Sequence, residues 1–311
     1  MRHRLRYVAI GLVTAGTACA PASSDLTDNA SDHAAPSAFL EDVESYVVTS
    51  AISGRDYSIS VALPYGYADS AKTYPALYAL DANGQFGTVV ETARMLRYEG
   101  FPQLVIVGIG YPYGGRQINA EPHRIIDFFP VLEHGWIEEL KGDWLEPVPI
   151  YDEGGAPAFL RFLTDELIPS IESKYNVAPY DRAIYGHSGG GWFSLYALLE
   201  SQGVFRRAIV GSPSLWWGDA IMFDLEASYA EEHSALPARV FLSIGADEPN
   251  TPVADIACLC MTRNFARLVD TLESRRYEGL EWTSHVFEGE SHNSVMPPTI
   301  SRGLRYIYGP S

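Results

Sequence analysis

The stretch from Gly186 to Gly190 limits the folds open to this chain more than any other feature. It spells Gly-His-Ser-Gly-Gly, with an apolar run at 183–185 before it and a helix-forming run at 192–199 after it. A serine on a tight turn from a strand into a helix is held at strained backbone angles, so small neighbours are needed to avoid steric clashes. The pattern therefore predicts a nucleophile elbow, with the Ser188 hydroxyl projecting above a sheet.

A serine hydroxyl needs a base, and the base needs an orienting acid, so both should follow downstream in this architecture. An apolar run at 239–244 ends in a turn that carries Asp247 and Glu248. We favour Glu248 as the acid because it lies beyond the strand tip and can point across the sheet, and Asp247 remains the alternative. The last β-rich run, 281–287, is followed by His292, which we predict to be the base.

Further motifs lie in the same order as in a known group of enzymes. They are Leu-Asp-Ala-Asn-Gly-Gln-Phe at 80–86, Phe-Leu-Arg-Phe at 159–162, Glu-Leu-Ile-Pro at 166–169 and Gly-Glu-Ser-His-Asn-Ser at 289–294. Over roughly residues 40–309 the chain resembles the putative-esterase branch of the α/β-hydrolase superfamily, which includes the siderophore trilactone esterases. The resemblance implies ester hydrolysis, and it matches Glu248 to the family's acid.

Catalysis also needs donors for the oxyanion of the tetrahedral intermediate, and backbone N–H groups supply them without reorganisation. Gly189 follows the nucleophile and should give one N–H group. The second should come from the loop after the third expected strand, where the resemblance implies Asn83. A plain turn built on Asn83 and Gly84 is the alternative interpretation.

The residues that choose the substrate are less clearly encoded. The stretch 111–151 is long, aromatic and acidic, and it predicts a lid or pocket rim. Within it, Arg124 is a candidate for contact with an anionic substrate, and a structural ion pair is the alternative. Trp217 is a candidate aromatic wall of the pocket, with burial in packing as its alternative.

Strand and helix signals alternate along the chain after two opening strands. Strands are expected at 46–53, 57–63, 76–80, 104–109, 182–185, 207–210, 239–244 and 281–287, and helices at 86–97, 156–174, 192–200, 256–274 and 298–307. Two antiparallel strands feeding a mostly parallel central sheet, with helices on both faces, is what this alternation predicts. The fold class is therefore α/β, of the α/β-hydrolase type. We expect Pro169 to kink its helix.

Composition fits one large domain at 39–311, because a chain of 311 residues that is 47% hydrophobic can bury a sizeable core. The formal net charge of −17 argues against a nucleic-acid partner, whose phosphates would be repelled. No residues have suitable metal-ligand spacing, so we expect no metal and no cofactor. Cys258 and Cys260 would point in different directions on the helix expected at 256–274, which predicts free thiols.

The first twenty residues are typical of an export signal, with a cationic start, an apolar stretch and small residues at its end. Cys19 is a candidate lipid-bearing residue, which would tether the chain to a membrane, and cleavage after Ala20 is the competing interpretation. Residues 21–38 are predicted to form a flexible linker. We therefore expect an exported protein, either in the bacterial periplasm or anchored as a lipoprotein.

Together these features predict an exported serine esterase that acts on a small-molecule carboxylic ester, with a siderophore trilactone as the substrate that the resemblance suggests. An acyltransferase of related fold would use the same residues but exclude water. A binding protein on a hydrolase scaffold would lack a reactive serine.

Overall fold

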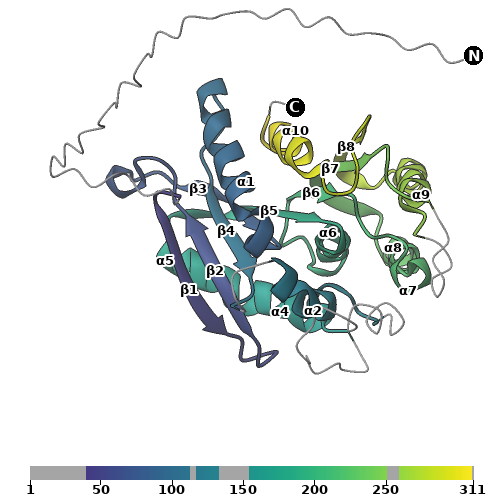
Figure 1. Cartoon of the computed structure of the whole chain (residues 1–311), viewed down its shortest axis with the longest axis horizontal. Coiled ribbons are helices and arrows are strands. Elements are labelled where there is room, and N and C mark those ends of the chain that lie inside the picture. Colours follow the sequence, from purple (N-terminus) through teal and green to yellow (C-terminus); the bar gives the residue numbers. More distant parts are fainter. Residues whose placement is uncertain (1–39, 113–116, 133–153, 251–258, 310–311) are drawn as a thin grey trace, which may run out of the picture. The chain divides into compact units, whose positions relative to one another are not determined.

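The computed structural model describes residues 40–112, 117–132, 154–250 and 259–309 (Figure 1). The segment Leu40–Ser311 forms one compact unit. The predicted export signal, Cys19, the linker and most of the expected lid at 111–151 lie outside the described residues. In the described part of the chain, no helix is both long enough and apolar enough to cross a membrane.

A mixed sheet runs through the centre of this unit. Its strands in chain order are β1 (Val43–Thr49), β2 (Asp56–Ala62), β3 (Tyr74–Ala79), β4 (Val105–Gly110), β5 (Val177–His187), β6 (Arg207–Gly211), β7 (Ala235–Gly245) and β8 (Glu278–Phe287). The spatial order is β1-β2-β4-β3-β5-β6-β7-β8. Strand β2 is antiparallel to both β1 and β4, whereas all other neighbours are parallel. The mostly parallel sheet predicted from the sequence is confirmed.

Helices cover both faces of the sheet (Figure 1). Helices α1 (Ala82–Leu96) and α10 (Met296–Tyr308) pack on one face. The other face carries α2 (Gln117–Phe128), α4 (Ala156–Arg161), α5 (Ile168–Lys174), α6 (Gly189–Glu200), α8 (Met222–Glu232) and α9 (Met261–Arg275). Neighbouring residues of a strand enter opposite cores: Tyr78 packs on the α6 side and Leu77 on the α1 side. Burial on both faces explains why the central strands are continuous apolar runs.

Two of these helices, α2 and α8, were not expected from the sequence. Pro122 lies inside α2, and a proline in a helix interior argues against a helix because it removes one backbone hydrogen bond. The expectation that Pro169 kinks its helix stays a prediction. A π-helical segment, η3 (Phe162–Leu167), directly precedes α5, which carries Pro169 near its start.

The expectation that Cys260 is a free thiol is wrong, because Cys260 is disulfide-bonded in the structure. The expectation placed Cys258 and Cys260 on one helix, where their side chains would diverge. Helix α9 instead begins at Met261, and Cys260 precedes it with a left-handed φ of 39°. The argument from helical geometry therefore does not apply to Cys260, and Cys258 lies outside the described residues.

Candidate active site

Strand β5 and helix α6 meet at Ser188 in the sharp turn that the sequence predicted. The backbone φ and ψ angles of Ser188 are 60° and −120°, a combination that residues other than glycine rarely adopt. The Ser188 N–H donates to the Gly211 carbonyl at 2.9 Å, and the Ser188 carbonyl accepts from the Trp192 N–H at 3.0 Å. This strained turn places the hydroxyl at the carboxyl end of a central strand, where sites on parallel sheets lie.

Gly186 shows why the elbow needs small residues, and it provides a stability prediction. A Cβ atom at Gly186 would lie 2.1 Å from the Gly190 carbonyl oxygen. We expect Gly186→Ala to lower the free energy of unfolding by about 3 kcal/mol, since neither backbone segment can move without breaking the turn. Chemical denaturation measures the change. Gly87→Ala in α1 is the matched control, because its Cβ would meet nothing within 4 Å. An equally small effect at both positions would contradict this prediction.

A histidine and a carboxylate lie together in the loops after β8 and β7. His292 Nδ1 is 2.7 Å from Glu248 Oε2, and the side chain of Glu248 is fully buried. Because a carboxylate only accepts hydrogen bonds, this contact assigns the N–H to Nδ1 and leaves Nε2 of a neutral imidazole as the acceptor. Asp247 is exposed, and its backbone N–H donates to the Glu290 carbonyl. Of the two acids weighed from the sequence, the one in contact with His292 is Glu248.

His187, next to Ser188 in the chain, packs against His292. Its ring centroid is 4.8 Å from that of His292, and it is buried. Burial, and then the proximity of His292, hold the pKa of His187 well below its usual value. His187 is therefore a neutral ring that packs against His292.

The two predicted oxyanion donors lie at the starts of two helices. Gly189 is the first residue of α6, and Asn83 is the second residue of α1. These helices follow β5 and β3, which are parallel neighbours, so their first turns lie at the same edge of the sheet. The first N–H groups of a helix have no intrahelical partner and carry the positive end of the helix dipole. The Asn83 side chain is already occupied, because its amide exchanges two 2.8 Å hydrogen bonds with the Tyr111 backbone.

Arg124 on α2 lies in a buried ion pair close to the start of α6. Its guanidinium contacts both carboxylate oxygens of Asp81 at 2.6 and 2.9 Å, and it contacts Glu121 at 2.8 Å. Only 7% of Arg124 is exposed, and a Cβ at Gly189 would lie 3.3 Å from its Nη2. Of the two interpretations from the sequence, the structural ion pair is the one present. A substrate contact by Arg124, which stays a prediction, would compete with two carboxylates.

Trp217 is packed inside the protein. Its indole stacks on Phe129 with ring centroids 4.0 Å apart, its N–H donates to the Val131 carbonyl at 2.8 Å, and only 2% of the residue is exposed. Burial in packing, the alternative considered from the sequence, describes this side chain. A ligand ring could stack on it only after displacement of Phe129, so its role as a pocket wall stays a prediction.

The loop after β6 holds two hydroxyl groups of this site that the sequence analysis missed. Ser212 Oγ donates to Glu248 Oε1 at 2.5 Å, and Ser214 Oγ lies 3.2 Å from Ser188 Oγ. The available signal was a polar turn, Ser-Pro-Ser at 212–214, directly after an apolar strand at the edge where site residues collect. Serine in a turn is common, so this pattern alone did not single them out.

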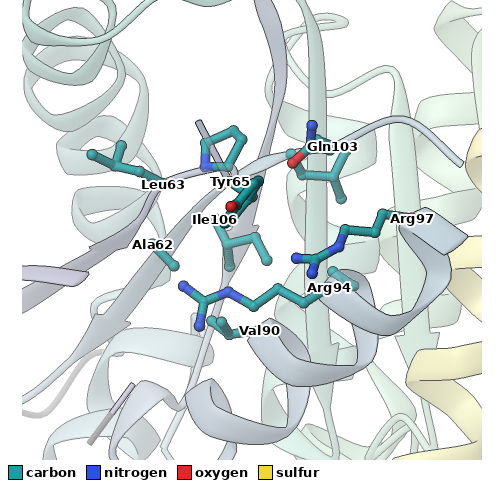
Figure 2. Close-up of a pocket in the computed structure, with 11 residues that line it drawn as sticks. Ala62, Leu63, Tyr65, Val90, Arg94, Arg97, Gln103 and Ile106 are labelled. Carbon is teal, nitrogen blue, oxygen red and sulfur yellow. The ribbon is translucent and has the colours of Figure 1, made fainter. Parts of the chain in front are cut away.

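A small pocket between α1 and β4 is separate from this site (Figure 2). Val90 and Ile106 form part of its apolar lining, and Arg94 and Arg97 come from the end of α1 and the turn after it. Ile106 is near the start of β4, so the pocket lies toward the opposite edge of the sheet from Ser188. Among the residues that the structure describes, no group of three or more metal-ligating side chains could hold a metal ion.

The fold and the strained serine turn define the class of an α/β hydrolase. The family model for "Putative esterase" matches residues 50–296. The chain belongs to this esterase family, as the resemblance in the sequence implied, and it is a carboxylic ester hydrolase.

Characterised relatives are similar over most of their length. The ferri-bacillibactin esterase BesA of Bacillus subtilis is 32% identical over 265 residues, which cover 82% of this chain and 86% of the relative. A siderophore enterobactin esterase of Emericella nidulans is 33% identical over 277 residues, covering 81% and 89%. Among solved structures, the BES protein from Bacillus cereus has a TM-score of 0.73 and 26% identity, with 89% and 99% of the two chains covered. These similarities confirm the predicted fold.

Proposed function

We propose that the chain is an exported serine esterase that hydrolyses a siderophore ester through Ser188, His292 and Glu248. The observation that carries the proposal is the contact of His292 with buried Glu248, in loops at the sheet edge that also carries the strained Ser188. The names of two relatives, a ferri-bacillibactin esterase and an enterobactin esterase, support the substrate class. A trilactone is the ester that we infer.

In the proposed reaction, His292 Nε2 removes the proton of Ser188 while Oγ attacks the ester carbonyl carbon. The N–H groups of Gly189 and Asn83 receive the oxyanion that forms. The ester C–O bond then breaks, and the imidazolium gives its proton to the leaving alkoxide oxygen. Water attacks the acyl-enzyme with His292 again as base, which releases the carboxylic acid and restores Ser188. Glu248 remains ionised and holds the imidazole in the required tautomer.

The Ser188 hydroxyl must turn during this sequence. Its hydrogen-bond partner in the structure is the Ser214 hydroxyl, at 3.2 Å. Contacts between nucleophile and base are often loose before substrate binds and tighten afterwards. We therefore infer that substrate binding moves the hydroxyl from Ser214 to His292 Nε2.

The net charge of the protein should affect the iron-free and the ferric forms of the proposed substrate differently. The protein carries a formal net charge of −17, which repels a polyanionic ferric complex. Arg124 offers little compensation, because Asp81 and Glu121 already hold its guanidinium. We expect the iron-free trilactone to be cleaved faster than the ferric form, and raised salt to narrow the difference. Equal rates for both forms at low salt would contradict this expectation.

Product analysis tests the proposed function. The purified protein is incubated with enterobactin, with its ferric complex and with p-nitrophenyl esters, and the products are followed by mass spectrometry. We expect opening of the trilactone to linear products. Cleavage of the p-nitrophenyl esters alone would remove the siderophore substrate but keep the esterase. Transfer of the acyl group to an added alcohol in place of water would favour the acyltransferase, and no labelling of Ser188 by a fluorophosphonate would favour a binding protein.

Export is a separate part of the proposal. The mass of the mature N-terminus, measured on protein from a bacterial host, distinguishes the two processing routes. A lipid on Cys19 would identify a membrane-anchored lipoprotein, and an N-terminus at Pro21 would indicate release after Ala20. Protein that remains in the cytoplasm with residues 1–20 intact would contradict export.

A further inference from the structure

The segment from Gly211, the last residue of β6, to Ser214 contacts both Ser188 and Glu248. The Gly211 carbonyl accepts the N–H of Ser188, and the Ser214 N–H donates to the Ser188 carbonyl at 3.1 Å. In between, Ser212 Oγ donates to Glu248. One short loop therefore fixes the position of the nucleophile relative to the acid.

Ser212 completes the hydrogen bonding of a buried carboxylate. Glu248 Oε1 accepts from Ser212 Oγ at 2.5 Å and from the Gly245 N–H at 2.9 Å, while Oε2 faces His292 Nδ1 at 2.7 Å. Only 4% of Glu248 is exposed, so water contributes little to its solvation. A buried carboxylate is costly without such donors, and the donors also fix its orientation.

The backbone of Ser212 is held in an unusual conformation. Its φ of 40° lies in the left-handed region, which is unfavourable for a residue other than glycine. The Ser212 N–H donates to the Ser243 carbonyl at 2.7 Å, and the residue is fully buried. Helix α6 packs against the same loop, since a Cβ at Gly191 would lie 2.5 Å from the Gly211 carbonyl oxygen.

We infer that Ser212 is a positioning residue for catalysis, which acts by holding Glu248 in the orientation that aligns His292 with Ser188. The inference rests on the proposed roles of these three residues. Ser212 does not touch the substrate. Its hydroxyl keeps Oε1 occupied, so that Oε2 alone is directed at the imidazole.

Replacement of Ser212 should change kcat and its pH dependence more than KM. We expect Ser212→Ala to lower kcat about ten- to a hundredfold, the range for a hydrogen bond to a charged group. Loss of a donor dipole from the Glu248–His292 pair makes protonation of the pair easier, whichever group takes the proton. The acid limb of kcat/KM against pH should therefore move upward by about half a pH unit or more. The neighbouring His187 is buried and neutral, so it does not titrate in this range.

Two further variants separate the hydroxyl from the fold. Ser243→Ala is the matched control, because Ser243 is also fully buried and its hydroxyl bonds Thr299 at 2.7 Å instead of Glu248. It should lose stability without a shift in the pH profile. Ser212→Gly removes the same hydroxyl as Ser212→Ala but tolerates the positive φ, so it folds more readily and should be equally impaired.

Steady-state kinetics and pH profiles on p-nitrophenyl esters test the positioning role of Ser212. Thermal unfolding of each variant measures its stability. Wild-type kcat in Ser212→Gly would overturn the positioning role while leaving the proposed triad intact. So would a loss of kcat in Ser212→Gly that Ser243→Ala matches and that leaves the pH profile of Ser212→Gly unshifted. An unimpaired Glu248→Gln would remove the acid itself, and with it the role of Ser212.

Discussion

Replacement of Ser188 by alanine should reduce ester hydrolysis by at least about ten-thousandfold and abolish labelling by a fluorophosphonate. The elbow presents one hydroxyl in a strained turn, and the groups left behind, the oxyanion donors and the binding surface, retain only a small part of the catalysis of such a site. Steady-state kinetics on a p-nitrophenyl ester, together with mass spectrometry of the labelled protein, measure both effects. Circular dichroism should show an unchanged fold.

Ser201→Ala is the control for this variant. Ser201 follows the same helix, α6, at its other end, and within the described part of the chain its buried hydroxyl has no hydrogen-bond partner. Its removal should leave both turnover and labelling unchanged. If Ser188→Ala kept more than about one percent of wild-type turnover, another nucleophile would have to act in place of Ser188.

The second large effect is expected at the acid–base pair. Glu248→Gln should reduce kcat/KM about a hundred- to ten-thousandfold, because glutamine neither fixes the imidazole tautomer nor stabilises the imidazolium. Asp247→Asn is the matched control, since Asp247 is the adjacent exposed acid and does not hold the histidine. The reverse ranking would move the role to Asp247, and mild effects from both would indicate a site that works with Ser188 and His292 alone.

The pH profile tests His292 itself. A protonated imidazole cannot accept the proton of Ser188, so activity should fall when the pH is lowered enough to protonate His292. His187 does not mimic this fall, because burial holds its pKa well below the usual value and the ring stays neutral. A flat profile from pH 5 to 9, or a His292→Ala variant with wild-type kcat/KM, would contradict the role of His292 as base.

The class of fold could be predicted because it depends on local patterns. Each expected strand is present, and the elbow lies where small residues separate an apolar run from a helix-forming run. Strand ends also indicated where Ser188, Glu248 and His292 would lie, since the carboxyl ends of parallel strands meet at one edge. That placement brought His292 near the turn with Asp247 and Glu248 but did not choose between the two acids.

Helix α2 was not predicted because its stability depends on residues that are distant in the sequence. Pro122 weakens its local pattern, whereas Arg124 binds Asp81 and Asp127 accepts a hydrogen bond from the Tyr111 hydroxyl at 3.0 Å. Burial raises the pKa of Asp127 to about 6 despite this contact and the nearby Arg55. A sequence does not show which charged residues are buried in this way, because their spacing is the same as that of charged residues on a solvent-exposed helix face.

The sequence alone determined the mostly parallel sheet and the turn at Ser188, because these depend on periodicity and on the backbone preferences of glycine. It also gave the chain order of the three residues proposed for catalysis. Only the tertiary structure decided which acid meets His292, that Arg124 pairs with Asp81, and that Trp217 is packed against Phe129. It also brought Ser212 to Glu248. These contacts join residues far apart in the chain, and their partners are chosen by the register and burial of packed elements, which no local pattern records.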